Sequence, residues 1–237
     1  MPTARAPGRP ERNRLLRALP TAEYDALRPD LHAVTLGHGA VLFEARARIS
    51  HVYFPQGCIV SLVTPAGEGP GVEVGLVGNE GMVGLSIFLG GRTATTQAVL
   101  QVPDGASRMS AAAFVRALAR GPALHRLMQS YARTLIGQIT QGAACNQRHV
   151  VGQRCARWLL MAHDRVGADR FTLTQEFLGQ MLGVQRPTVS LAAQELQALG
   201  LIRYVRGQVT IADRAGLEAA ACGCYGVLAA DYARAFA

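Results

Sequence analysis

The 237-residue chain contains no lysine, so all 24 of its basic side chains are arginines. Aromatic residues make up only 6% and charged residues 17%, whereas hydrophobic residues make up 49%. These fractions are typical of a globular chain and argue against disorder. Apolar stretches such as HVYFPQGCIVSLV are interrupted by proline and glycine, and none is long enough to span a bilayer. The length is sufficient for two domains of ordinary size.

The signals of export, metal binding and catalysis are also missing. The opening stretch MPTARAPGRPERNRLL lacks the apolar segment of a secretory signal. Five cysteines without a regular framework indicate free thiols, so we expect a cytoplasmic protein with no membrane partner. The cysteines and histidines are too scattered along the chain to predict a metal site. A nucleophile elbow and a P-loop are absent, so the prediction is a protein that is not an enzyme and has no catalytic residues.

The net charge of +8 is unevenly distributed along the chain. Residues 1–20 hold five arginines and one acid, and residues 151–237 hold nine arginines and seven acids. Half of the excess therefore lies in a short N-terminal arm. A basic balance suits a polyanionic partner, although a solvated tail would give the same count.

Residues 31–109 alternate between short apolar runs and turn signals. The runs HAVTL, AVLFE, ISHVYFP, CIVSLVT, VEVGLV and TTQAVLQV are separated by glycine-rich and proline-rich turns. Strands of about five residues at such spacing predict an antiparallel sandwich or barrel. After Arg108 the pattern becomes helical, with Ser110 as the N-cap of a helix that stops at Gly121.

A helix of about 25 residues is predicted to follow from Pro122. Its apolar residues lie three or four positions apart in one narrow stripe formed by Leu124, Leu127, Tyr131, Leu135 and Ile139. A narrow stripe of this length is typical of a helix that pairs with its twin. The alternative is that the stripe packs on its own domain.

The stretch LTQEFLGQMLGVQRPTVSLAAQELQALG predicts two helices around a tight turn. Thr174 is the expected N-cap of the first helix, and Gly183 can take the left-handed conformation that ends it. The second helix opens with Arg186 and Pro187, and proline is tolerated there because first-turn amides have no acceptor within the helix. The following GLIRYVRGQVTI alternates around Arg206 and Gly207 as a β-hairpin does. Together these signals predict a winged helix-turn-helix.

The outward face of the second helix contains the side chains expected to contact double-stranded DNA. Arg186 is placed to reach a guanine edge, and Leu191 to contact thymine methyl groups. Arginines of the wing suit phosphates, which position a protein without reading the sequence. The predicted DNA-binding residues are Gln175, Gln185, Arg186, Pro187, Thr188, Ser190, Leu191, Gln194, Arg203 and Arg206.

The order of β-rich segment, long helix and winged helix resembles the Crp/Fnr transcription regulators over roughly residues 15–211. The resemblance implies an α+β fold with an antiparallel β-roll or jelly roll, and a homodimer that binds a two-fold-related DNA site. It divides the chain into an arm with short helices (1–30), a cyclic-nucleotide-binding-like sensor domain (31–121), a dimerisation helix (122–147) and the DNA-binding domain (148–237). RNA polymerase is a further partner that the family suggests.

The family's nucleotide-binding members hold the ribose with a glutamate and the cyclic phosphate with an Arg-Ser pair. Here Leu85 follows Gly84 where the glutamate is expected, and Thr95 and Thr96 occupy the Arg-Ser position. Without a guanidinium the phosphate would be poorly compensated, so binding of the cyclic-AMP receptor's type is not expected. A different pose would use the tentative effector residues Gly84, Leu85, Ser86, Arg92, Thr95 and Thr96.

The expected function is therefore a dimeric, sequence-specific regulator whose β-roll modulates DNA binding, with an unknown effector and unknown cofactors. Two alternatives stay open. One is a regulator that responds to another nucleotide, to haem or to a redox signal. The other is a protein-interaction module in which the winged helix contacts protein, since the surplus of two positive charges in residues 151–237 is modest for a DNA binder.

Overall fold

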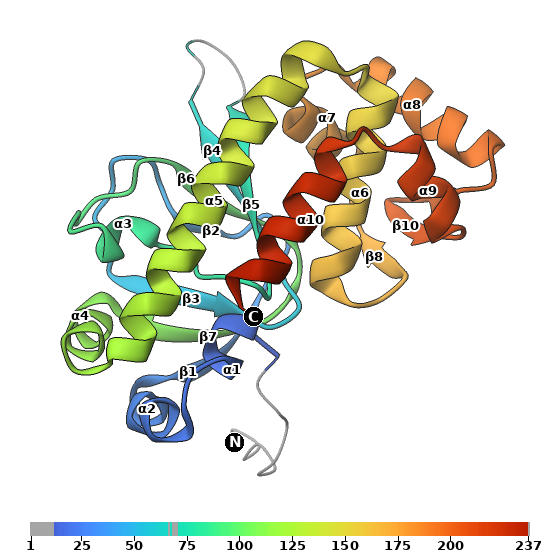
Figure 1. Ribbon diagram of the computed structural model, residues 1–237. Coiled ribbons are helices and arrows are strands. Elements are labelled where there is room, and N and C mark those ends of the chain that lie inside the picture. The colour runs from blue at the N-terminus through green and yellow to red at the C-terminus, as the bar shows by residue number, and fades with distance from the viewer. Residues whose placement is uncertain (1–11, 66, 68–70, 237) are drawn as a thin grey trace, which may run out of the picture.

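A computed structural model of the chain describes residues 12–65, 67 and 71–236; the predicted arm lies largely outside this part, in residues 1–11. Figure 1 shows a β-rich part and a helical part on either side of one long helix. The helices are α1 (Arg14–Arg17), α2 (Thr21–Leu27), α3 (Leu85–Phe88), α4 (Ala111–Arg120), α5 (Pro122–Arg148), α6 (Val151–Val166), α7 (Gln175–Leu182), α8 (Arg186–Ala198), α9 (Arg214–Ala220) and α10 (Cys224–Ala235), with the 3₁₀ turn η1 (Arg28–Asp30).

The β-rich part consists of two antiparallel sheets, in the orders β1-β7-β3 and β2-β6-β4-β5. Their strands are β1 (His32–Leu36), β2 (Val41–Phe43), β3 (His51–Pro55), β4 (Ile59–Thr64), β5 (Val72–Val77), β6 (Gln97–Val102) and β7 (Asp104–Ser110). The six apolar runs predicted as strands coincide with β1 to β6. Together with α5 and the helix-turn-helix, this arrangement confirms the predicted α+β class.

Strand β7 was not predicted, although it is the central strand of its sheet. Its sequence DGASRMS begins with a turn signal and contains few residues that favour strands. It is held by antiparallel pairing with β1 on one side and β3 on the other. Its small residues Ala106 and Ser107 are buried, so tertiary pairing overrides the local preference.

The two largest hydrophobic cores in the described part of the chain lie against α5 and around α6. The first joins the inner faces of the sheets to one face of α5 and to α1. The second belongs mainly to α6, α7, α8 and the wing, but it also includes Ile59, Leu76 and Val102 of the β-rich part. The two parts of the chain therefore share one core and are not joined by a linker alone.

The C-terminal part contains a three-stranded sheet in the order β8-β10-β9, formed by β8 (Arg170–Thr172), β9 (Ile202–Val205) and β10 (Gln208–Ile211). After the wing the chain forms α9 and then α10, which runs back beside α5 toward the β-rich part (Figure 1). None of the helices in the described part of the chain combines the length and the apolar character needed to cross a bilayer.

Candidate nucleic-acid interface

The helix-turn-helix is built by a sharp corner between α7 and α8. The Thr174 hydroxyl caps α7 by accepting the backbone N–H of Phe177 at 3.3 Å. Gly183 ends α7 with a φ of 63°, the left-handed conformation predicted for it. Gly179 was not singled out from the sequence, yet a Cβ there would lie 3.0 Å from the carbonyl oxygen of Val184. The absence of a side chain at Gly179 therefore lets the corner close against α7.

Helix α8 presents one apolar face to the core and one face to solvent. Val189, Ala192, Ala193 and Leu196 are buried, at intervals that place them on one face of the helix. Leu199 follows the end of the helix at Ala198 and is 69% exposed. The predicted DNA-binding residues exposed on and just before this helix are Gln185, Arg186, Pro187, Thr188, Leu191 and Gln194.

Two of the predicted DNA-binding residues hold the motif together instead of standing free. The Ser190 hydroxyl donates to Gln175 Oε1 at 2.9 Å and also lies 3.1 Å from the carbonyl oxygen of Arg186. Both side chains are partly buried. The structure thus places Ser190 and Gln175 as a link between α8 and α7, at the edge of the exposed face.

The wing is fixed to the same unit by Tyr204. Its hydroxyl donates to the carbonyl oxygen of Leu173 at 2.8 Å, and its backbone N–H donates to Gln197 Oε1 at 2.8 Å. Burial raises the pKa of Tyr204 to about 12, which keeps the hydroxyl a donor. Arg206 and Gly207 both have positive φ, as in a two-residue hairpin turn. Arg203 and Arg206 are exposed on the hairpin.

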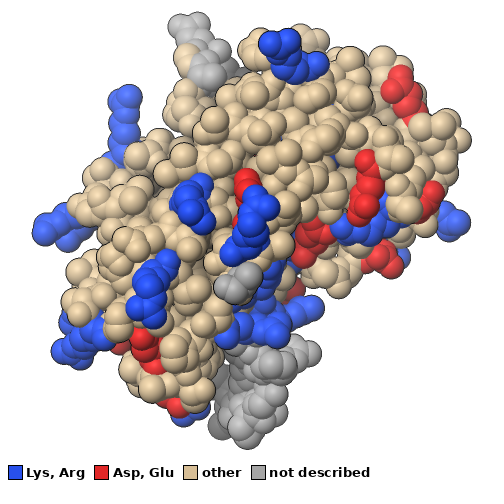
Figure 2. Space-filling view, in the orientation of Figure 1, with Lys and Arg blue, Asp and Glu red and all other residues tan. Residues whose placement is uncertain are grey.

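The charge around this face is mixed. Figure 2 shows arginines spread singly over the β-rich part and α5, with most of the visible acidic groups over the C-terminal part. Arg186, Arg203 and Arg206 bring positive charge to the helix-turn-helix and wing, whereas Glu176 and Glu195 are exposed on α7 and α8. The positive charge is thus local to the start of α8 and the wing.

The predicted effector residues divide between two cavities. Gly84, Leu85, Ser86, Thr95 and Thr96 line a cavity of about 140 Å³ beneath α5, whose other lining residues are apolar. None of its described lining residues carries a charge. Its volume is below the roughly 300 Å³ of the smallest usual ligand pockets.

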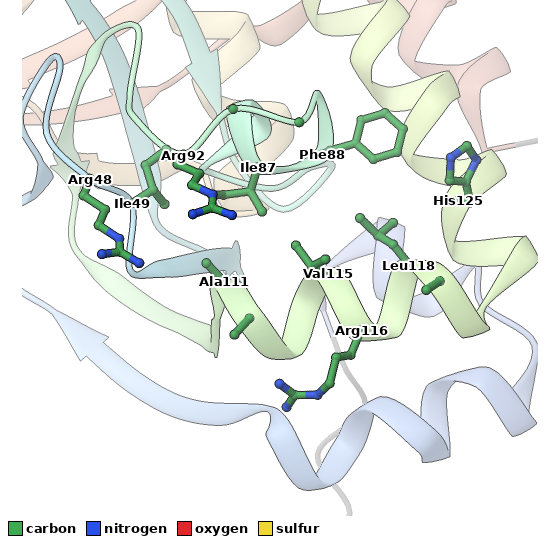
Figure 3. A pocket seen from close by; sticks show the side chains of 14 residues that line it. Arg48, Ile49, Ile87, Phe88, Arg92, Ala111, Val115, Arg116, Leu118 and His125 are labelled. Atoms are coloured by element: carbon green, nitrogen blue, oxygen red, sulfur yellow. The ribbon is translucent and has the colours of Figure 1, made fainter.

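Arg92 does not belong with these five residues, which corrects its grouping with them. It lines a separate cavity of about 810 Å³ between α3, α4 and the start of α5. Figure 3 shows Arg48 and Arg92 toward one end of this cavity and Phe88 with His125 toward the other. The Arg92 side chain therefore borders the larger cavity, whereas Thr95 and Thr96 border the smaller one.

The structure also corrects the role predicted for the apolar stripe of α5, which packs on its own chain. Leu124, Tyr131 and Leu135 are at most 2% exposed and lie in the core of their own chain. The Tyr131 hydroxyl donates to the carbonyl oxygen of Met82 at 2.9 Å. Leu127 and Ile139 pack on the same core. The stripe covers the β-rich part because that part has an apolar face of its own to bury. Of the residues predicted for dimerisation, Leu124, Tyr131 and Leu135 are therefore buried within their own chain, and Leu127 and Ile139 are partly buried against it.

Four of the cysteines and histidines that are scattered along the sequence lie together in the structure. Cys145, His149, Cys222 and Cys224 have side-chain ligand atoms that all lie within 4.8 Å of one another. The remaining thiols, Cys58 and Cys155, are buried elsewhere, in the two main cores.

The β-rich part and the helix-turn-helix are tied by polar contacts around α5 and α6. The Glu80 carboxylate, in the loop after β5, pairs with Arg165 Nε of α6 at 3.0 Å, and both side chains are buried. Arg165 Nη2 donates to Gln138 Oε1 of α5 at 3.0 Å. Tyr232 of α10 donates its hydroxyl to the same oxygen at 3.1 Å. A single buried network thus connects four segments that are distant in sequence.

Comparison with known proteins agrees with this architecture. Residues 153–220 match the family model of the Crp-like helix-turn-helix domain. No protein of curated function matches the sequence.

The fold is similar to that of FixK2 from Bradyrhizobium japonicum, with 15% identity, a TM-score of 0.69, and 81% of this chain and 98% of that chain covered. It is similar to CLP, a c-di-GMP-responsive global regulator from Xanthomonas campestris, with 15% identity, a TM-score of 0.65 and coverage of 81% and 99%. A CRP-family transcriptional regulator from Thermus thermophilus is 18% identical, with a TM-score of 0.63 and coverage of 79% and 96%. The chain therefore contains a Crp-like helix-turn-helix domain and has the same fold as these solved structures.

Proposed function

We propose that this protein is a sequence-specific DNA-binding transcription regulator that acts as a homodimer. The observation that carries the proposal is the exposed face of α8 within a Crp-like helix-turn-helix domain. A helix held by its inner face and free on its outer face can enter a major groove. Arg186 in its first turn suits the O6 and N7 atoms of guanine.

The test is a fluorescence anisotropy titration of the full chain with a selected duplex and with random duplexes. We expect affinity to fall steeply with salt. Arg186→Ala should reduce discrimination at one base pair of each half-site by about 1–3 kcal/mol. Arg234→Ala, which removes an exposed arginine of α10, is the matched control and should leave base preference unchanged. Unchanged preference in Arg186→Ala would contradict the assignment of α8 as the reading helix.

A protein partner is the second candidate for this face. Leu191 and Val205 are 61% and 64% exposed, and both lie on the helix-turn-helix and wing. Exposed aliphatic side chains suit protein contacts as well as thymine methyl groups. If the chain ignores every duplex at low salt, the protein-binding function becomes the better explanation.

We infer that the dimer forms along the solvent face of α5, opposite the stripe that packs inside the chain. Exposed residues recur there at alternating intervals of three and four over the length of the helix, which is the period of a two-helix seam. They are Arg126, Gln129, Arg133, Ile136, Thr140, Ala143 and Gln147. Ile136 is 55% exposed in the middle of this seam, and the small Ala143 allows close approach.

Sedimentation velocity tests the dimer. Ile136→Glu places a like charge on both sides of the two-fold seam, so we expect a monomer that binds its DNA site at least tenfold more weakly. Val227→Glu is the control, since Val227 is 51% exposed on α10, outside the seam. A dimer that persists in Ile136→Glu would place the interface elsewhere.

We further propose that the β-roll modulates DNA binding without the cyclic-AMP contacts of the cyclic-AMP receptor. The small, uncharged cavity over Gly84 supports this, because it provides no cation for a cyclic phosphate. The larger cavity bordered by Arg48, Arg92 and Arg116 is the better candidate for an anionic effector. Calorimetry with a panel of cyclic nucleotides should detect no sub-micromolar binding to the Arg92→Ala variant. Sub-micromolar binding to that variant would place the nucleotide in the small cavity and contradict the proposal.

A further inference from the structure

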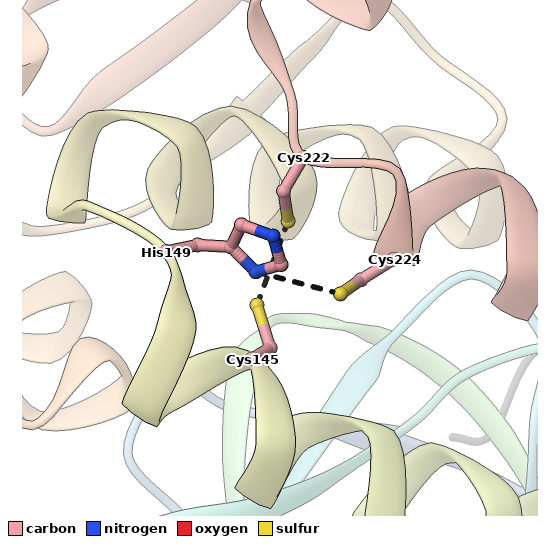
Figure 4. A group of neighbouring side chains, drawn as sticks. All are labelled: Cys145, His149, Cys222 and Cys224. Carbon is pink, nitrogen blue, oxygen red and sulfur yellow. Dashed lines mark hydrogen bonds between the residues drawn. The ribbon is translucent and has the colours of Figure 1, made fainter.

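We propose that Cys145, His149, Cys222 and Cys224 form a tetrahedral site for one zinc ion. Cys145 and His149 are one turn apart at the end of α5, so they face the same side of the chain. Cys222 and Cys224 lie in the connection between α9 and α10 and at the start of α10. Figure 4 shows the three sulfur atoms and the imidazole ring pointing toward one another from these two segments.

Two of the distances between ligand atoms match those around a single zinc ion, and all the others are at most 4.8 Å. Cys145 Sγ lies 3.5 Å from Cys222 Sγ, and Cys224 Sγ lies 3.6 Å from His149 Nδ1. A tetrahedron with Zn–S bonds of about 2.3 Å and a Zn–N bond of about 2.0 Å has edges of roughly 3.5–3.8 Å. The sulfur atoms of Cys145 and Cys222 are well beyond the ~2.0 Å of a disulfide bond.

The donor types also favour zinc. Three thiolates and one imidazole are a common structural zinc set, and soft sulfur ligands disfavour magnesium and calcium. An iron–sulfur cluster would hold its ligands apart across several iron atoms, whereas all four ligand atoms here lie within 4.8 Å of one another. The three thiols are buried in a small cluster of their own, which excludes water as structural zinc sites do.

Two buried arginines provide the second, independent observation. Arg154 and Arg157 of α6 are 7% and 8% exposed, and neither Nε atom has a hydrogen-bond partner in the described part of the chain. Both guanidinium groups are close enough to Cys145 to interact with it electrostatically. Arg157 also interacts electrostatically with Glu73, so the buried cation that lacks an acidic partner among its interactions in the described part of the chain is Arg154. A buried cation without a counter-charge is costly. Three thiolates around Zn²⁺ carry a net charge of minus one, which supplies that counter-charge.

A further contact supports the ligand set from outside. Gln141 Nε2 donates to Cys224 Sγ at 3.0 Å. Hydrogen bonds from neighbouring groups commonly orient metal-bound thiolates and moderate their charge. Gln141 is one turn before Cys145 on α5. The end of this helix therefore provides two ligands, Cys145 and His149, and also the side chain that orients a third ligand, Cys224.

The proposed ion would fasten the start of α10 to the end of α5. The segment between α5 and α6, His149 and Val150, is where the chain passes from the long helix to the helix-turn-helix domain. A metal there would fix this junction as a structural staple. The inference is independent of DNA binding, because it concerns only metal content and the geometry of the junction.

The experiment uses the full chain, reduced and handled without oxygen, to which one equivalent of Zn²⁺ is added before gel filtration. We expect one zinc ion per chain by elemental analysis. Replacement by Co²⁺ should give the intense d–d bands of tetrahedral cobalt together with thiolate-to-cobalt charge-transfer bands. This spectrum is recorded on the unmodified chain, so it does not depend on whether a variant folds.

Cys222→Ser and Cys224→Ser should each lose at least tenfold in zinc affinity, whereas Cys58→Ser, which removes a buried thiol far from the cluster, should retain the metal. The proposal is overturned if the unmodified chain retains no zinc and gives no tetrahedral cobalt spectrum. It is equally overturned if Cys58→Ser loses metal as readily as Cys222→Ser, or if thiol mapping of the metal-free chain finds Cys145 and Cys222 joined as a stable disulfide.

Discussion

Replacing Arg165 with methionine should destabilise the folded chain more than any surface substitution. Arg165 Nε lies 3.0 Å from the Glu80 carboxylate, and the two side chains are 6% and 3% exposed. Its other nitrogens donate to the carbonyl oxygen of Met161 at 2.9 Å and to Gln138 Oε1 at 3.0 Å. Methionine has a similar volume but satisfies none of these acceptors.

The expected cost follows from the charge that is left behind. Without Arg165, the Glu80 carboxylate retains hydrogen bonds from the Gly78 amide, 3.2 Å from each oxygen, but loses its cation. Removing one partner of a buried ion pair typically costs about 3–5 kcal/mol. Glu80→Gln should cost less than the arginine change, because the amide still accepts a hydrogen bond. The double variant should be less destabilised than the sum of the singles by about 1–3 kcal/mol.

Urea denaturation followed by tryptophan fluorescence is a suitable assay. The single tryptophan, Trp158, donates its indole N–H to Glu73 at 3.0 Å between α6 and β5, so it reports on the same junction. Arg234→Met is the control, because the Arg234–Asp231 pair is near the surface and should contribute less than about 1 kcal/mol. A cost below about 1 kcal/mol for Arg165→Met, or strict additivity in the double variant, would refute the reasoning.

Two further predictions concern the same domains. Burial raises the pKa of Glu73 from 4.5 to about 7, so the folded chain binds this proton more tightly than the unfolded chain. The free energy of unfolding should therefore fall by about 3 kcal/mol as the pH rises through this window, and urea denaturation across the window should find this fall abolished in Glu73→Gln. Thr174→Ala removes the cap that accepts the Phe177 amide, which should lower the free energy of unfolding by about 1 kcal/mol, while Thr174→Ser should restore it.

The helix-turn-helix was predictable because its determinants are local. Thr174 caps α7 through a residue three positions away, and Gly183 and Gly207 adopt positive φ where the sequence required a turn. Each signal is confined to a few neighbouring residues, so it can be recognised without the rest of the fold. The six predicted strands share this property, whereas β7 depends on two partners that are far away in sequence.

What each face of α5 packs against was not predictable from the spacing of its apolar residues. The spacing of Leu124, Tyr131 and Leu135 correctly identifies an apolar stripe. The spacing does not indicate whether the same chain or a second copy packs against that stripe. In the structure the cover is the β-rich part of the same chain. The opposite face, centred on Ile136, is mostly polar and gave no apolar pattern to detect.

The cysteine cluster escaped detection for a related reason. Each half is a short spacing, Cys145 with His149 and Cys222 with Cys224, that occurs by chance in many chains. The halves are 77 residues apart, and they meet only because α9 and α10 carry the chain back to the end of α5. A turn of the chain that is set by tertiary packing cannot be inferred from the spacing of the ligands.

The same return of α10 limits how far the helix-turn-helix can move relative to the β-rich part. Gln138 accepts hydrogen bonds from Arg165 and Tyr232 while its amide donates to the carbonyl oxygen of Leu76 at 3.0 Å. The residues that it joins belong to β5, α6 and α10, which also share an apolar core across the two parts of the chain. A helix-turn-helix held in this way cannot swing about the α5–α6 junction without breaking buried hydrogen bonds and exposing Leu76. Any movement of the helix-turn-helix relative to the β-rich part would therefore exchange one set of buried contacts for another, because a freely hinged domain is incompatible with these contacts.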